Sequence, residues 1–207
     1  MDEFSIVVLS LVGCVFAASA AAKLSSRPAY RSFRGGLAES GLIPVPMLPA
    51  TAACLAGTEA VAAAGLLAAA ALTAAAAPGA AWVAEPALAT AALLTTALTL
   101  GVAVIVRRGT RARCACFGAG SRRPLGRAHL ARNLSLLAVI CSGLALAPLA
   151  HGRPAPVAAV LAAVAAAVAA LLFILWDDVA ELFTPIPSPQ VSPVFSATPG
   201  TPGRRDA

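Results

Sequence analysis

Charged residues are scarce in this chain. Asp, Glu, Lys and Arg together make up 12% of its 207 residues, whereas hydrophobic residues make up 59% and the mean hydropathy is +0.86. Soluble domains carry about 25% charged and about 45–50% apolar residues. The shortage of charge, together with apolar runs too long for the core helices of a small soluble protein, excludes an ordinary soluble domain. We therefore predict an integral membrane protein.

Motifs of the common cofactor-dependent classes are also missing. The sequence holds no nucleotide-binding loop, no haem-attachment motif and no convincing hydrolytic triad. Its two histidines, His129 and His151, leave few ligands for a zinc ion, which needs four. We expect no metal site and no evident cofactor. A quinone is compatible with the sequence, because a helical bundle can bind one through packing that leaves no motif.

Five apolar segments meet the length test for crossing about 30 Å of hydrocarbon, which takes roughly 20 residues. The fourth is short and must borrow length from its basic N-terminal flank. Pro78-Gly79 separates the second from the third and is typical of a tight turn between antiparallel helices. The abundant alanines let helices approach closely in lipid, so we expect an all-α bundle rather than a soluble alanine-rich one. The segments are residues 4–22, 47–75, 80–106, 134–150 and 155–176.

Basic residues predict the orientation of the bundle, because Lys and Arg accumulate on the cytoplasmic side. With the N-terminus outside, every basic residue except Arg153 falls in a cytoplasmic segment. Topology then explains the net charge of +6, and no nucleic-acid partner is needed. We expect a multi-pass protein of the plasma membrane. The predicted cytoplasmic residues are Lys23, Arg27, Arg31, Arg34, Arg107, Arg108, Arg111, Arg113, Arg122, Arg123, Arg127, Arg132, Arg204 and Arg205.

Cys114-Ala115-Cys116 lies in the arginine-rich segment between the third and fourth apolar runs. Neighbouring cations lower the pKa of a thiol from about 8.5 and favour the reactive thiolate. A disulfide between cysteines one residue apart closes a small, strained ring, and strained disulfides are oxidising and exchange readily. The pattern favours thiol-redox chemistry at a cytoplasmic loop. A metal site and two inert thiols are the alternatives.

Glu59 is a second signal, since it falls near the middle of the second apolar segment. An ionised carboxylate at the bilayer centre costs at least ~2.5 kcal/mol and usually marks a functional or a paired group. Lys23, at the end of the first segment, is the candidate partner. A protonated Glu59 bonded to Thr58 or to a neighbouring helix is the alternative. Both a structural role and a redox, proton or ligand role stay open.

Arg132 and Asn133 open the fourth segment, close to the cysteine loop if that loop folds back over the helix ends. Arg132 there could hold a thiolate, cap a helix or bind lipid phosphate, and anchoring at the membrane boundary is the favoured interpretation.

Residues 1–176 form the predicted membrane domain. Residues 177–207 are rich in Pro, Ser and Thr, which predicts a disordered tail.

Lys23, Glu59, the Cys114-Ala115-Cys116-Phe117-Gly118 run and Arg132-Asn133 together resemble the MauE family of methylamine-utilisation membrane proteins, which is related to the DoxX family. The resemblance covers about residues 1–150. It implies a DoxX-like four-helix core, to which this chain adds a fifth transmembrane helix. It identifies Cys114 and Cys116 as the thiol pair and leaves the roles of the other matched residues unassigned.

The resemblance also implies a function. Such a protein works with a thioredoxin-like partner to mature an extracytoplasmic disulfide-containing client, such as the methylamine dehydrogenase light chain. If the pair is cytoplasmic, it relays electrons across the membrane; if the orientation is inverted, it works outside. A thiol-disulfide oxidoreductase is thus one hypothesis. A non-catalytic membrane chaperone or scaffold is the main alternative, and a small-molecule transporter centred on Glu59 is a weaker one.

Overall fold

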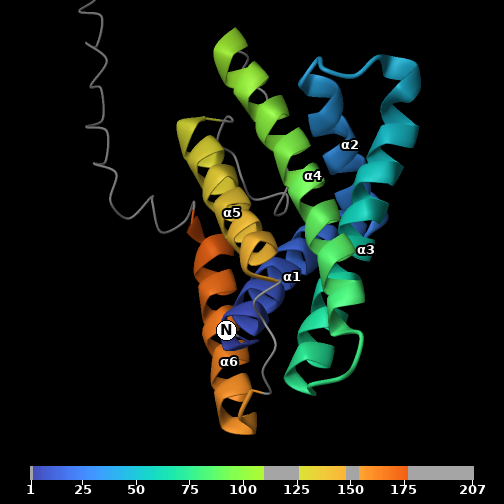
Figure 1. Ribbon diagram of the computed structural model, residues 1–207. Helices are drawn as coiled ribbons and strands as arrows, with labels where there is room; N and C mark the ends of the chain where they lie inside the picture. The colour runs from blue at the N-terminus through green and yellow to red at the C-terminus, as the bar shows by residue number, and fades with distance from the viewer. Residues whose placement is uncertain (1, 110–125, 148–153, 177–207) are drawn as a thin grey trace, which may run out of the picture.

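The protein is a bundle of α-helices in a computed structural model that describes residues 2–109, 126–147 and 154–176 (Figure 1). Within these ranges there is no strand. The cysteine pair, the segment 148–153 and the predicted tail from residue 177 lie outside the described residues. The elements are α1 (Asp2–Leu24), α2 (Arg27–Glu39), the short 3-10 helix η1 (Val45–Met47), α3 (Leu48–Ala74), α4 (Ala80–Arg108), α5 (Arg127–Leu146) and α6 (Pro156–Ile174).

Among the described residues, five helices are long and apolar enough to cross a membrane: α1, η1 with α3, α4, α5 and α6. Each corresponds to one predicted segment, so the all-helical membrane fold is confirmed. The turn between α3 and α4 also lies where it was predicted, with Gly79 in the left-handed region at φ 84°, which favours glycine.

The predicted bounds of the fourth segment were wrong. The helix α5 begins at Arg127, seven residues before the predicted start, and ends at Leu146. Its 20 residues span about 30 Å, so the basic N-terminal flank does supply the missing length. Arg132 and Asn133 therefore lie in the second turn of the helix and do not open it.

The helix α2 was not predicted, because its 13 residues are too few and too polar to span a membrane. Ser26 caps its start, where the Ala29 amide donates to Ser26 Oγ at 3.2 Å, and Pro28 occupies the first turn. The helix is amphipathic, since Phe33 is buried while Arg31 and Arg34 are exposed. Such a helix is typical of the membrane interface.

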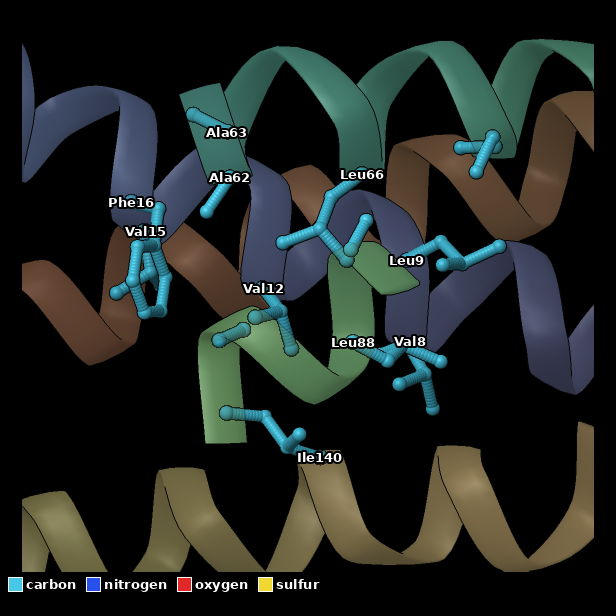
Figure 2. Packing of buried hydrophobic residues seen from close by; sticks show 14 of the residues in the cluster. Val8, Leu9, Val12, Val15, Phe16, Ala62, Ala63, Leu66, Leu88 and Ile140 are labelled. Atoms are coloured by element: carbon cyan, nitrogen blue, oxygen red, sulfur yellow. The ribbon is translucent and has the colours of Figure 1, made fainter. Parts of the chain in front are cut away.

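The core of the bundle is built around α1, which packs against α3, α5 and α6. Figure 2 shows Val8, Leu9 and Val12 of α1 among side chains of three other helices, namely Leu66 of α3, Leu88 of α4 and Ile140 of α5. Small residues permit this packing. A Cβ added to Gly143 of α5 would lie 2.7 Å from Cγ1 of Val8, so any larger residue there would force Val8 or the helix to shift.

The last helix, α6, packs on α1 through alanines at every third or fourth position. Ala159, Ala162, Ala166 and Ala170 are buried, whereas Val160, Leu161 and Leu171 are each more than half exposed. Large apolar side chains are likewise exposed on α4, including Leu93 and Leu100. The helix α6 thus turns small residues inward, and α4 and α6 both expose large apolar residues, as expected for a multi-pass membrane protein whose outer face contacts lipid.

Candidate functional site

Lys23 and Glu59 form an ion pair inside the bundle. Each residue is 1% exposed. The Lys23 Nζ donates to Glu59 Oε1 at 2.6 Å and contacts Oε2 as well. Ser19 completes the network, because its Oγ accepts a hydrogen bond from Lys23 Nζ at 2.9 Å and donates one to Glu59 Oε2 at 3.2 Å. The ammonium thereby uses all three of its donors within the protein.

Helix geometry explains how the three groups meet. Ser19 and Lys23 are four residues apart in α1 and therefore share one face of that helix. Glu59 lies on the buried face of α3, with Ala56 and Ala62 on either side. These small neighbours let α3 approach α1 closely enough for a direct pair. Thr58, the alternative partner of Glu59, instead donates its hydroxyl to the Cys54 carbonyl.

Phe33 of α2 packs beside the Lys23–Glu59 ion pair. The Lys23 Nζ lies 5.0 Å from the centroid of the Phe33 ring, which is within the range of a cation–π contact. Phe33 is 6% exposed and packs on Ala52 and Ala56 of α3. The short helix α2 therefore adds an aromatic wall beside the ion pair.

A cavity of about 300 Å³ adjoins the pair. Helices α1 to α5 all contribute to its lining, and α6 adds Phe173. Most of the wall is apolar. Its polar side chains include Ser19, Lys23, Glu59, Thr95, Arg132 and Asn133. The four candidate residues outside the cysteine loop, which are far apart in the sequence, are thus brought together around one space.

Arg132 differs from the expectation of a boundary anchor. The residue is 5% exposed and lines the cavity rather than standing at the surface of the bundle. Asn133, its neighbour, is half-buried in the same wall. His129, one turn earlier in α5, is also buried there. The polar face of the first two turns of α5 is therefore directed toward the cavity.

Cys114 and Cys116 lie outside the described residues, so the prediction that they are the reactive pair stays a prediction. The segment that carries them joins Gly109, which caps α4, to Gly126, which precedes α5. Among the described cysteines, Cys14 packs against the core, whereas Cys54 and Cys141 are exposed on the outer face of the bundle.

Sequence reasoning missed three residues of this site: Ser19, Phe33 and Thr95. Ser19 had a signal, since it precedes Lys23 by one helical turn. For Phe33 the signal was weaker: Ser26 and Pro28 are typical of the start of a helix, and this helix, α2, carries Phe33. Thr95 had none, because it is one of several threonines in an apolar run and only packing distinguishes it.

A family model described as "Methylamine utilisation protein MauE" matches residues 1–147, which is more than half of the chain. The match includes α1 to α5 and leaves out α6. No curated protein and no solved structure shows a significant match. The matched region contains the ion pair, Arg132, Asn133 and the two cysteines of the predicted thiol pair.

Proposed function

The chain belongs to the MauE family of methylamine utilisation proteins, and we propose that it is a membrane thiol-redox accessory protein. In this proposal Cys114 and Cys116 exchange electrons with a thioredoxin-like partner and so support disulfide formation in an extracytoplasmic client. The methylamine dehydrogenase light chain is the client that the family suggests.

One observation carries the proposal. Ile105 of α4 and His129 of α5 both line the cavity. Ile105 lies four residues before Gly109, and His129 lies three residues after Gly126. The segment that bears the cysteines is therefore tethered, on both sides, about one helical turn from the wall that holds Lys23, Glu59 and Arg132.

Thiol exchange transfers two electrons at each step. A thiolate of the partner attacks the disulfide of the Cys114/Cys116 pair and forms a mixed disulfide, releasing one thiol of the pair. The second partner cysteine then displaces the remaining sulfur of the pair. The partner ends as a disulfide that can oxidise the client, and the pair ends as a dithiol that a two-electron acceptor must reoxidise.

Serine substitutions test the role of the thiols. We expect Cys114→Ser and Cys116→Ser, singly or together, to reduce the fraction of mature, disulfide-bonded client by at least tenfold, because serine cannot form the mixed disulfide. The client is measured by a gel-shift assay with a thiol-reactive polymer. Cys141→Ser, at an exposed position, is the matched control and should have no effect. Unchanged maturation in the double variant would instead support a scaffold that needs no thiols.

We also propose that the N-terminus is outside and that the cysteine pair is cytoplasmic. Figure 1 shows α2, the last turn of α4 and the first turn of α5 at one end of the bundle. These elements carry exposed arginines, including Arg31, Arg34, Arg107 and Arg108. Basic residues concentrated at one end support a cytoplasmic position for that end.

Thiol labelling in intact cells tests this orientation. In a variant whose only cysteine is Cys116, a membrane-impermeant maleimide should react only after the cells are permeabilised. Adding Ala75→Cys to a chain without other cysteines gives the control, since Ala75 is exposed in the turn at the other end of the bundle. That variant should react without permeabilisation. Efficient labelling of Cys116 from outside would invert the topology.

A further inference from the structure

We propose that the cavity beside the Lys23–Glu59 pair binds the head group of a membrane-soluble quinone. The volume of about 300 Å³ lies at the lower end of the range for small-molecule sites. It suits a substituted ring whose apolar chain stays in the lipid. Leu94, Leu98 and Leu136 are among the aliphatic residues of the wall, so a ligand that enters it must be largely apolar.

Thr95 supplies the observation that points to a ligand. The residue is 3% exposed and lines the cavity, yet its Oγ1 has no hydrogen-bond partner. Thr90 and Thr99 of the same helix satisfy their hydroxyls with the carbonyl four residues earlier, at 2.7 and 2.6 Å. Thr95 does not. A buried hydroxyl left without a partner costs about 1–3 kcal/mol, and a ligand oxygen in the cavity would remove that cost.

The hydrogen bonds of Lys23 favour a neutral ligand. Its ammonium is fully engaged by Glu59 and Ser19, so a carboxylate or phosphate would compete with these partners for it. A neutral carbonyl oxygen needs only a hydrogen-bond donor, and the Thr95 hydroxyl and the Asn133 amide both offer one.

The use of such a ligand rests on the proposed function. A dithiol that becomes a disulfide gives up two electrons and two protons, and a quinone that accepts both leaves as the quinol. The cavity would thus hold the electron acceptor for the Cys114/Cys116 pair. Binding itself does not depend on the cysteines.

Decylubiquinone binding to the purified full chain in lipid nanodiscs tests the proposal. We expect Thr95→Val to raise the Kd about five- to tenfold, the loss expected for one hydrogen bond. The matched control is Thr96→Val, which changes the adjacent, exposed threonine and should leave the Kd unchanged. Because the Thr95 hydroxyl has no hydrogen-bond partner in the described part of the protein, Thr95→Val should keep or raise the unfolding temperature of the wild type, so weaker binding cannot be ascribed to misfolding.

A competing ligand and a cysteine variant complete the binding experiment. Decanoic acid, which replaces the ring by a carboxylate, should compete poorly; competition as strong as that of the quinone would overturn the preference for a neutral ligand. No binding of decylubiquinone to the wild type, or equal binding to both valine variants, would overturn the site. The variant with Cys114→Ser and Cys116→Ser should bind the quinone normally. Binding that persists while this variant still matures the client would refute the proposed thiol function and leave the quinone site intact.

Discussion

Replacing Lys23 with methionine is expected to lower the free energy of unfolding by about 3–5 kcal/mol, the usual cost of breaking a buried ion pair by removing one partner. Methionine keeps much of the side-chain volume but leaves the Glu59 carboxylate without its ammonium. Ser19 alone can then donate to that carboxylate. The loss is measured as the change in unfolding free energy of the purified protein in mixed micelles as the denaturing detergent is increased.

The double variant Lys23→Met/Glu59→Leu separates a structural role from a functional one. Removing both charges leaves no unpaired charge inside the bundle, so most of the lost stability should return. If the pair serves the chemistry of the cavity, client maturation should stay low although the fold is restored. Arg34→Met, which removes an exposed cation of α2, is the control and should change stability by less than about 0.5 kcal/mol. A stable and inactive double variant supports function; a stable and active one assigns the pair to structure alone.

The membrane helices could be predicted because their signal is local. A run of about 20 apolar residues forms a spanning α-helix in lipid. Residues 80–106 illustrate this, since α4 differs from the prediction only by two residues at its end. The start of α5 was predicted wrongly because the same local signal misled. Residues 127–133 contain two arginines and a histidine, so hydropathy assigns them to a loop. In the structure Arg132 and His129 are buried around the cavity, where packing compensates their polarity.

The site was only partly predictable. Glu59 needed a partner on energetic grounds, and Lys23 was the candidate cation, but a protonated Glu59 bonded to Thr58 or to a neighbouring helix stayed open until the structure showed the pair. The cavity could not be predicted, because its wall combines six helices whose rotations no single segment determines. The role of Phe33 could not be predicted either, because α2 is placed beside the ion pair by tertiary contacts alone. The DoxX-like relation of the core and the chemistry of the cysteine pair stay predictions.

Phe33 is expected to shield Lys23 from water and from reagents in it. The ring lies 5.0 Å from the ammonium, and its helix α2 carries exposed arginines that place it at the aqueous boundary of the bundle. Phe33→Ala removes the ring and opens a path to the ion pair. Lys23 is the only lysine of the chain, so its modification by an amine-reactive ester can be followed by mass spectrometry of the surrounding peptide.

We expect Phe33→Ala to increase the rate of Lys23 modification at least tenfold, because the wild-type ammonium is both buried and held by Glu59. Phe33→Leu restores an apolar side chain and should return the rate toward that of the wild type. Ser32→Ala, at the adjacent exposed position, controls for loosening of α2. If Phe33→Ala leaves Lys23 as protected as before, the barrier is the ion pair itself. The aromatic wall would then shape the cavity without closing it, and access to Glu59 would depend on how often the ammonium leaves the carboxylate.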